Sequence, residues 1–376
     1  MNIKKIAIIG NLANVGFTMT KYMSELDVIC NLIVTESQYS LLKKQNPDVD
    51  LSQCSFIRII KDSGILKKYT VKLDIVKVLN EYDIIISVGL GGFWSLPLVS
   101  KPYVAYATGS DLRELAMGGK EYPRINKIVS RYLFKKAKMI FYSPDQGHLD
   151  AIKKLQLKNT IPWRQFVDID FWNMDEVRVN PEQIRIFHPT ALQWTGKFTG
   201  MLGKGNDILF KGFKIFLDKG GKGILFYLQR GLNLPETEKL IDELGIKQFC
   251  IPHGTTLNKI ELRSTMHTMD VIVDQFHLGG GYGLIILESI ALGKPAIAGV
   301  FDSMYQMAYK ETKEPMPFVQ AFTPEQVATQ LLRLQSYSVR KKISLEGREW
   351  IEKYHAPRKL ACWYLEMIQN APSLLK

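Results

Sequence analysis

Short apolar runs alternate with amphipathic stretches along the whole chain, and this alternation is the strongest constraint on its fold. Runs such as DIIISVG show no polar alternation, which is typical of strands buried on both faces of a parallel sheet. We predict strands at residues 5–10, 28–34, 56–60, 83–89, 103–108 and 139–143, and again at 184–189, 223–228, 249–253, 271–276, 295–300 and 317–322. Two such sets with interleaved helices predict two doubly wound α/β domains.

The domain boundary is expected in the polar stretch at residues 170–182, which precedes the second set of strands. We predict an N-terminal domain over residues 1–173, a C-terminal domain over 174–352, and a final helical segment over 353–376 that packs back on the N-terminal domain. A length of 376 residues suits two domains of ordinary size. Thr323-Pro324 predicts a helix start, and a helix break is expected near Pro357.

Composition excludes several classes of protein. No apolar run approaches the ~20 residues that cross a bilayer, and the first apolar run is too short for a signal peptide, so we predict a cytoplasmic location. The cysteines show no spacing suited to zinc, and we expect buried free thiols at Cys30, Cys54, Cys250 and Cys362. A formal net charge of +12 is compatible with nucleic acid, an anionic membrane or phosphate-bearing substrates as partners.

The basic charge clusters at Lys120–Lys138. On a helix the cations form one stripe beside an apolar one: Arg124, Lys127, Arg131, Lys135 and Lys138 beside Ile125, Ile128, Val129 and Tyr132. This pattern has two interpretations, a peripheral contact with an anionic membrane or a solvated face of a basic protein. The basic stripe lacks interleaved aromatics, and the segment has no recognised nucleic-acid-binding motif, so we predict no nucleic-acid partner.

The segment at residues 271–300 carries the most chemical information. A predicted strand leads into a glycine-rich loop and then into a helix that carries Glu288. Bare glycine backbone admits close approach, and free N–H groups with the helix dipole favour an anion. Glu288 lies where a carboxylate can accept hydrogen bonds from a ribose diol. The alternative is an ordinary turn with Glu288 as a solvated helix residue.

This segment resembles the donor-binding signature of glycosyltransferase family 4, a retaining family with the GT-B fold. The family pattern is close to E-x-F-G-x-x-x-x-E-A-x-A-x-G-x-P. Tyr282-Gly283 matches F-G and Glu288 matches the second glutamate, whereas Gly280 stands in place of the first. The resemblance implies two Rossmann-like domains that face a central cleft. It also implies donor-binding roles for Gly279, Gly280, Gly281, Tyr282 and Gly283.

Lys204-Gly205 resembles a second family element, in which a lysine pairs with the donor diphosphate. The resemblance implies catalytic roles for Lys204 and Glu288. Where the family has an arginine, about five residues earlier, this chain has Thr199, and Lys197 is the nearest basic substitute for donor binding. The alternative for Lys204 is an exposed lysine at a helix start.

Two segments of the N-terminal half are expected to bind the acceptor. Residues 106–113 resemble the family's H-G-S-D-x-R or G-x-D-x-R segment, which implies acceptor contacts by Asp111 and Arg113. Asp111 has an equally open alternative as a cap of the following helix. The loop at residues 10–16 has the layout of a Rossmann turn, and Asn14 is its candidate acceptor contact.

Asp168-Ile169-Asp170 spells the metal-binding DxD motif of another transferase fold, but it resembles the family 4 linker N-G-V-D-x-x-x-F, so we predict no metal. The resemblance implies a retaining transfer from a nucleotide-diphosphate sugar to a glycan or lipid-linked acceptor in cell-envelope polysaccharide synthesis. No cofactor beyond the co-substrate is expected. Because Gly280 replaces a glutamate, a catalytically silent GT-B protein that binds a nucleotide sugar or a partner enzyme remains an alternative.

Overall fold

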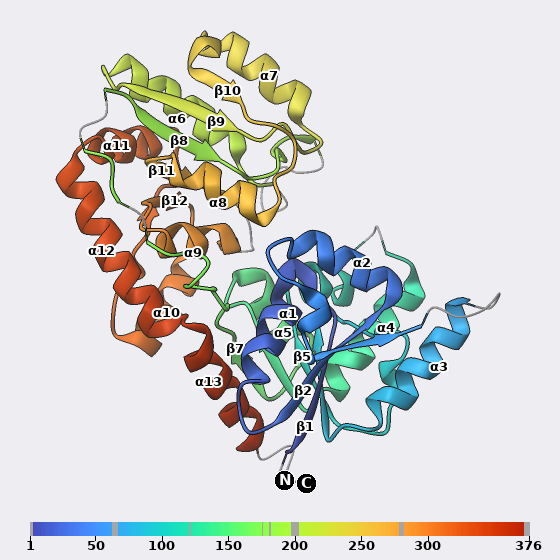
Figure 1. Cartoon of the computed structure of the whole chain (residues 1–376). Helices are drawn as coiled ribbons and strands as arrows, with labels where there is room; N and C mark the ends of the chain where they lie inside the picture. The colour runs from blue at the N-terminus through green and yellow to red at the C-terminus, as the bar shows by residue number, and fades with distance from the viewer. Residues whose placement is uncertain are drawn as a thin grey trace. The chain divides into compact units, whose positions relative to one another are not determined.

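The computed structural model (Figure 1) describes residues 3–61, 67–119, 122–174, 176–179, 182–196, 203–277 and 282–371. The chain divides into two compact units. One comprises Met1–Phe166 with Pro357–Lys376, and the other comprises Val167–Ala356. The sequence-based boundaries after residues 173 and 352 therefore lie a few residues from the divisions seen here.

The first unit is built on a parallel sheet in the order β3-β2-β1-β4-β5-β6-β7. Its strands are β1 (Lys5–Ile9), β2 (Ile29–Thr35), β3 (Ile57–Ile60), β4 (Ile84–Val88), β5 (Tyr103–Tyr106), β6 (Met139–Tyr142) and β7 (Thr160–Pro162). Its helices are α1 (Val15–Met23), α2 (Glu36–Gln45), α3 (Lys67–Leu79), α4 (Arg124–Lys136), α5 (Gln146–Leu155) and α13 (Pro357–Gln369). Strand β7 was not predicted, because a three-residue, partly exposed edge strand leaves no apolar run.

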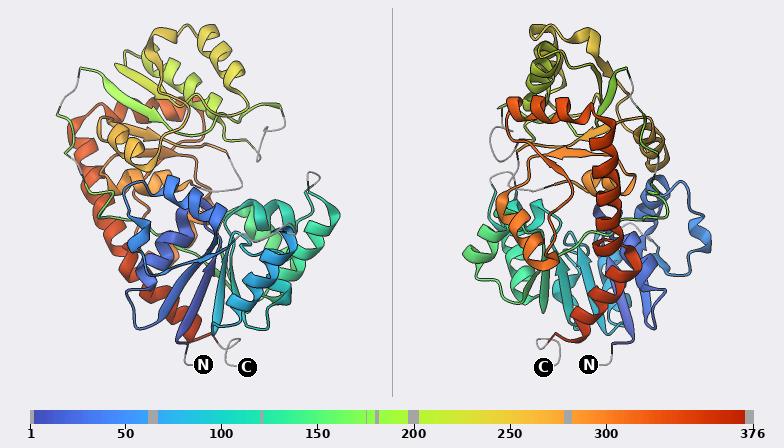
Figure 2. Two further views of the ribbon diagram at one scale, coloured as in Figure 1. Left: turned by 45° about the vertical axis from the view of Figure 1, so that its right-hand side comes forward. Right: turned by 90° about the vertical axis from the view of Figure 1, so that its left-hand side faces the viewer.

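Helices cover both faces of this sheet, as a buried parallel sheet requires. Side chains alternate along β1, so that Ile6 and Ile8 join the core under α1 and α13. Ala7 and Ile9 join the core under α3, α4 and α5. Figure 2 shows α13, in dark red, running along this unit, and α13 contacts α1.

Tyr364 explains why the last helix belongs to the first unit. Its side chain is fully buried, its ring lies 4.8 Å from that of Phe141, and its hydroxyl donates to the Arg164 carbonyl oxygen at 2.6 Å. A buried tyrosine hydroxyl needs such a partner.

The second unit has a parallel sheet in the order β10-β9-β8-β11-β12-β13. Its strands are β8 (Ile184–His188), β9 (Gly223–Tyr227), β10 (Cys250–Pro252), β11 (Val271–Val273), β12 (Ala296–Ala298) and β13 (Val319–Gln320). Its helices are α6 (Asn206–Asp218), α7 (Leu234–Glu243), α8 (Lys259–His267), α9 (Leu284–Ala291), α10 (Asp302–Thr312), α11 (Pro324–Leu334) and α12 (Tyr337–Tyr354). One face packs on α6, α7 and α11, and the other on α8, α9 and α12.

Several local predictions can be compared directly with the structure. The Thr323 side chain caps α11 by accepting from the Gln326 amide, and α12 and α13 are separated at His355–Ala356 as predicted. All four cysteines are free, but the expectation of burial was wrong for two of them: Cys54 is partly exposed and Cys362 exposed. Within the described ranges, none of the helices combines the length and apolar content that crossing a bilayer requires.

Candidate functional site

The strand order of the second unit reverses between β8 and β11. Connections leave these two neighbouring strands in opposite directions, so a crevice opens beyond their carboxyl ends, where open α/β sheets bind ligands. His188 ends β8, and Asp274 directly follows β11. The residues around this switch point are therefore the first candidates for a site.

Asp274 fixes the amino end of α9. Its carboxylate accepts from the Thr190 hydroxyl at 2.6 Å and from the Gly283 amide at 2.9 Å. A Cβ added at Gly283 would lie 2.9 Å from the same carboxylate, so the close approach requires glycine. The Gly283 amide predicted to bind the donor is thus already engaged by the protein, and its donor contact stays a prediction.

His188 is fully buried beneath the switch point. Its Nδ1 bonds the Val273 carbonyl oxygen at 2.8 Å, and its Nε2 faces the Asn206 side-chain nitrogen at 2.8 Å. These partners indicate a neutral ring with the proton on Nδ1. The pKa of His188 is lowered to about 4, chiefly by burial, and the charges of Lys204 and Arg230 act in the same direction. The imidazole therefore holds Asn206 in place as a neutral group.

Two asparagines hold the loop at residues 190–196. Asn206 accepts from the Gln193 amide at 2.9 Å, and Asn233 accepts from the amides of Trp194 and Thr195 at 2.9 and 3.2 Å. Buried side-chain acceptors of this kind replace secondary structure in fixing a loop. The loop that follows β8 is consequently positioned by residues far from it in sequence.

Lys204 lies between this loop and the start of the glycine-rich segment. Its amide donates to the Gln193 carbonyl oxygen, and its own carbonyl oxygen accepts from the Phe276 amide at 2.9 Å. Gly205 has φ +64°, and a Cβ there would lie 2.8 Å from the His277 ring. The structure thus brings residues 204 and 276–277 together. The predicted donor-binding residues Lys197, Gly279, Gly280 and Gly281 lie outside the described residues.

Arg230 is a second cation at this edge, and it was not predicted from the sequence. Its guanidinium donates to the Pro189 carbonyl oxygen at 2.9 Å, directly after β8. The available signal was its position in LFYLQRG, just after a predicted strand, since carboxyl ends of parallel strands share one edge. Arg230 and Lys204 both contribute to the lowered pKa of His188, and the Lys204 amide and the Arg230 guanidinium both bond the segment that follows β8.

Glu288 lies in the second turn of α9. Burial raises the pKa of its carboxyl to about 7, against a lowering effect of the Lys259 ammonium. Within the described part of the chain, no hydrogen bond to this carboxylate occurs. Such a desolvated carboxylate gains from a ligand that donates hydrogen bonds to it, as a vicinal diol does. The neighbouring Tyr282 packs its ring 5.6 Å from that of Phe318.

In the first unit, Asn14 belongs to a network of amides. It adopts φ +61°, and its side chain exchanges hydrogen bonds with Asn46 at 2.7 and 3.0 Å and accepts from Asn11 at 3.1 Å. These bonds occupy both ends of the amide and hold the loop after β1 against α2. An acceptor contact by Asn14 stays a prediction.

Asp111 also has a clear structural role. Its buried carboxylate accepts from the backbone amides of Thr108, Gly109 and Leu112 at 2.8–3.2 Å. Asp111 thus satisfies backbone amides beside a helix start, as a helix cap does. It is nevertheless the first residue of the short π-helix Asp111–Ala116, and Ser110 occupies the cap position. The carboxylate organises the loop after β5.

Arg113 lies near the start of the same π-helix. A Cβ added at Gly147 would lie 2.4 Å from the Arg113 Cδ, so the arginine stem packs on the start of α5. Its guanidinium pairs with Glu114 at 3.5 Å. Beside it Asp145 and His148 form a fully buried pair. No sequence pattern marked that pair, because Asp145 was not distinguishable from an ordinary helix cap.

Asp168, the first acid of the DxD tripeptide, supports a turn. Its carboxylate accepts from the Phe171 amide at 3.2 Å, and its carbonyl oxygen accepts from the Trp172 amide at 2.7 Å. Over the described ranges there is no group of three or more His, Cys, Asp or Glu side chains arranged to hold a metal ion.

An apolar cavity of about 180 Å³ lies at the carboxyl edge of the first unit's sheet. It is lined at the ends of β1, β2 and β3 by Ile9, Thr35 and Ile60, and by Phe93 and Trp94 from the loop after β4. The Trp94 ring meets Phe93 edge to face at 5.0 Å and is 41% exposed. This edge adjoins the first unit's own switch point, between β1 and β4.

Comparisons with solved structures identify the fold. HepE from Anabaena with UDP and glucose matches at 13% identity and a TM-score of 0.67, over 98% of this chain and 100% of that one. Sucrose-phosphate synthase from Thermosynechococcus elongatus matches at 13% identity and a TM-score of 0.66, over 97% of this chain and 98% of that one. A glycosyltransferase from Rickettsia africae matches at 15% identity and a TM-score of 0.65, over 100% of both chains. The chain has the GT-B fold. No protein-family model matches the sequence, and neither does any curated protein.

Proposed function

We propose that the protein is a retaining glycosyltransferase that moves a sugar from a nucleotide-diphosphate sugar to a glycan or lipid-linked acceptor. The observation that carries this proposal is the pair of cations, Lys204 and Arg230, beside the switch point of the second unit. HepE, whose structures hold UDP and UDP-glucose, supports the choice of donor.

The chemistry follows from charge. As the bond between sugar and diphosphate breaks, negative charge grows on the leaving oxygen, and fixed cations stabilise it without reorganisation. Lys204 and Arg230 are assigned this role, and Glu288 is assigned the ribose diol. The acceptor hydroxyl approaches on the face that the diphosphate leaves, and its proton passes to the departing diphosphate. Retention at the anomeric carbon results.

The acceptor is assigned to the first unit. The cavity beside Phe93 and Trp94 is apolar, which suits an acceptor with a lipid or other apolar portion better than a free sugar. Asp111 and Arg113 position the adjoining loop. An acceptor of this type fits cell-envelope polysaccharide synthesis at the inner face of a membrane.

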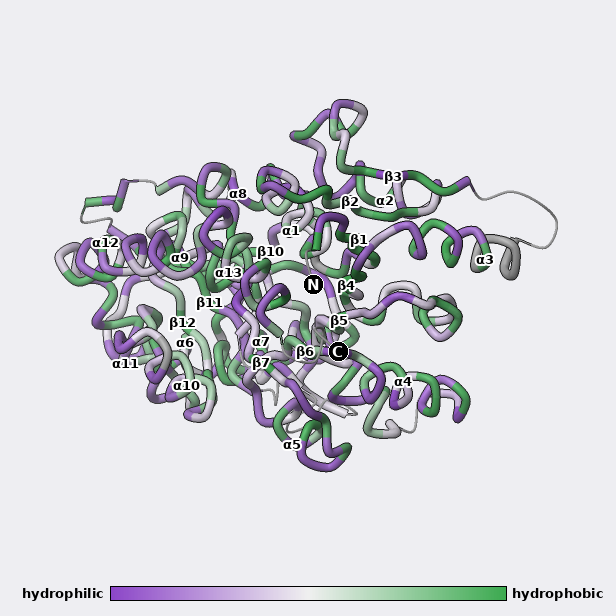
Figure 3. The backbone as a smooth tube through the Cα atoms, turned by 90° about the horizontal axis from the view of Figure 1, so that it is seen from below, coloured by the Kyte–Doolittle hydropathy of each residue, from purple (hydrophilic) through white to green (hydrophobic). Residues whose placement is uncertain are grey.

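Helix α4 supports a peripheral membrane contact. Ile125, Ile128 and Tyr132 are 54%, 61% and 45% exposed, respectively, and lie along one side of the helix. Figure 3 shows hydrophobic and hydrophilic residues alternating along α4, and the exposed Lys135 and Lys136 follow Tyr132. Exposed apolar side chains beside cations are typical of a helix that lies in an anionic interface.

Ligand-induced stabilisation tests the donor assignment. UDP-, GDP- and ADP-sugars are added to the full chain and the thermal transition is followed; a ligand at 100 times its Kd adds about 2.7 kcal/mol. We expect one nucleotide class to stabilise the wild type, and Lys204→Ala and Arg230→Ala to weaken binding at least tenfold. Lys211→Ala, which changes an exposed lysine on α6 paired with Asp207, is the control. Unchanged affinity in both site variants would remove the cations from the site.

The second candidate is a catalytically silent GT-B protein. It is favoured by Gly280, which stands where the resembling family has its first glutamate. Product analysis with the stabilising donor separates the two functions, since a silent protein binds it without forming a glycoside or hydrolysing it. If a glycoside forms, the anomeric proton coupling in its NMR spectrum reports retention or inversion.

A further inference from the structure

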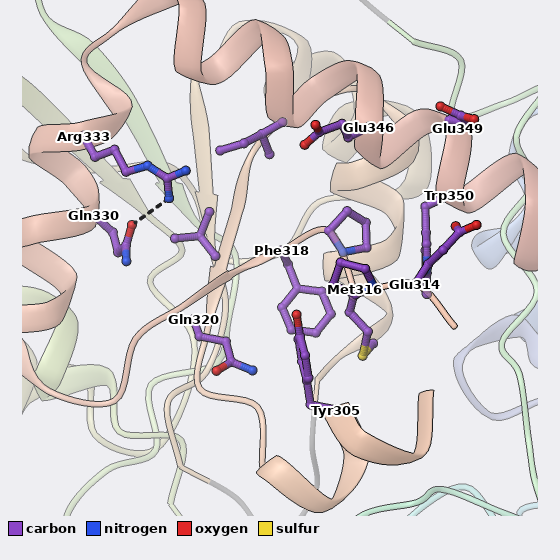
Figure 4. Close-up of a pocket in the computed structure, with 14 residues that line it drawn as sticks. Tyr305, Glu314, Met316, Phe318, Gln320, Gln330, Arg333, Glu346, Glu349 and Trp350 are labelled. Atoms are coloured by element: carbon purple, nitrogen blue, oxygen red, sulfur yellow. Dashed lines mark hydrogen bonds between the residues drawn. The ribbon is translucent and has the colours of Figure 1, made fainter. Parts of the chain in front are cut away.

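A second cavity lies in the second unit, away from the residues assigned to the donor. It has a volume of about 650 Å³ and is lined by α10, the segment leading into β13, α11 and α12. Ligand pockets commonly measure ~300–1,000 Å³. Strand β13 is the edge of the sheet, so its outer side faces away from β12. Figure 4 shows the side chains that line the cavity.

Aromatic and sulfur-bearing side chains form the apolar part of the lining. They are Tyr305, Met316, Phe318 and Trp350. Trp350 is 4% exposed, and its indole N–H has no hydrogen-bond partner within the described part of the chain. A buried donor without a partner is uncommon in folded proteins, and here it belongs to a side chain that lines the cavity.

Polar groups of both kinds complete the lining. Arg333 and Gln330 of α11 and Gln320 of β13 carry N–H donors, and the Arg333 guanidinium bonds the Gln330 side chain at 3.4 Å. Glu346 and Glu349 of α12 supply acceptors. Figure 4 shows Arg333 and Gln330 on one side of the cavity and the two glutamates on α12.

The charges of the lining decide between ligand classes. Glu314 is paired with Lys353, whose ammonium lowers the pKa of that carboxyl. Among the described residues, Glu346 pairs loosely with the exposed Lys342 at 3.8 Å, and such pairs contribute little. Glu346 and Glu349 would repel an anionic ligand, and Arg333 would repel a cationic one. A neutral ligand that both donates and accepts hydrogen bonds is repelled by neither kind of charge.

We propose that this cavity is a binding site for a neutral saccharide, distinct from the donor site. Sugar hydroxyls donate to Glu346 and Glu349 and accept from Arg333 and Gln330. The apolar face of the sugar ring packs on Phe318 or Tyr305. Phe318 also contacts Tyr282, so one aromatic ring connects this cavity with the residue that leads into α9.

Direct binding tests the proposal without any reliance on transfer. Neutral mono-, di- and oligosaccharides are titrated into the full chain, with saturation-transfer NMR and tryptophan fluorescence as readouts. We expect at least one saccharide to bind, and Glu346→Gln and Arg333→Leu each to weaken it about tenfold. Both residues are exposed, so the variants should fold, which circular dichroism checks. Glu366→Gln, which changes an exposed acid on α13, is the control.

Two further titrations separate this site from the donor site and from a site for ions. Titration of Lys204→Ala with the same saccharide should give the wild-type affinity; a loss there would place the saccharide in the donor site and overturn the proposal. Spermidine and inorganic phosphate serve as cationic and anionic probes. The proposal would also be overturned if every saccharide failed to bind while one of these ions bound, with an affinity that Glu346→Gln or Arg333→Leu lowered tenfold. If no nucleotide sugar binds, the donor assignment fails, but the saccharide proposal is still decided by its own titrations.

Discussion

The carboxylate of Asp274 accepts a hydrogen bond from the amide of Gly283 at 2.9 Å, so an acid of the protein occupies the amino end of α9. A helix amino end attracts negative charge, and here the chain supplies that charge itself. The proposed diphosphate must therefore be neutralised chiefly by side-chain cations. This relationship makes Lys204 and Arg230, rather than the dipole of α9, the groups on which the donor assignment rests.

Asp274 should contribute strongly to stability. Asp274→Ala removes the acceptor of two donors at once, the Thr190 hydroxyl and the Gly283 amide. We expect the free energy of unfolding in urea to fall by about 3 kcal/mol. Asp218→Ala, which removes an exposed pair with Lys214, should change it by less than about 0.5 kcal/mol. Combining Asp274→Ala with Thr190→Val should cost less than the sum, because both changes remove one shared bond.

Glu288 should make stability depend on pH. Its folded pKa of about 7 lies above the ordinary value of 4.5, so the folded chain binds more protons than the unfolded chain between these values. The contribution of this carboxyl to stability is therefore fully present below pH 4.5 and is lost as the pH rises through 7. Glu288→Gln should raise the unfolding free energy by about 2–3 kcal/mol at pH 8 and change it little at pH 4.

Ligand binding gives an independent check on Glu288. If ribose hydroxyls donate to the carboxylate, the ionised form binds better, and donor affinity should rise between pH 6 and pH 8. That rise should disappear in Glu288→Gln. A pH profile that is identical in wild type and variant would show that the carboxylate does not contact the donor.

Gly205 should be required for the placement of Lys204. Gly205→Ala demands a left-handed conformation and puts a Cβ 2.8 Å from the His277 ring. Gly220→Ala is a matched control, because Gly220 has φ +81° but open space around its Cβ position. We expect Gly220→Ala to cost about 1 kcal/mol and Gly205→Ala about 1–3 kcal/mol more. Only Gly205→Ala should also weaken donor binding; equal effects of the two variants would contradict the proposed geometry.

The exposed face of α4 should govern vesicle binding. We expect the protein to sediment with vesicles rich in an anionic phospholipid, and less so as salt is raised. Ile128→Glu should reduce the bound fraction severalfold, because it removes apolar area and adds repulsion. Leu345→Glu changes an apolar side chain on α12 that is 52% exposed and serves as the control. If both variants bind like the wild type, α4 is a solvated face.

The sequence by itself determined the two α/β units, nearly all of their strands and the start of α11. These features are encoded locally: the largely apolar run Ile84–Val88 favours a strand buried on both faces, and Thr323 starts a helix because its side chain accepts from the Gln326 amide. The short edge strand β7 was not predicted, because three partly exposed residues are too few to form a recognisable apolar run.

Only the tertiary structure decided which polar groups meet at the switch point. Thr190 and Asp274 are separated by 84 residues, and His188 reaches Val273 across 85. Such pairs arise because β8 and β11 become neighbours in the sheet, and strand order is set by how whole helices pack on the two faces. The sequence puts His188 and Arg230 at or just after the ends of predicted strands, but their chemistry depends on burial and charge supplied by distant segments.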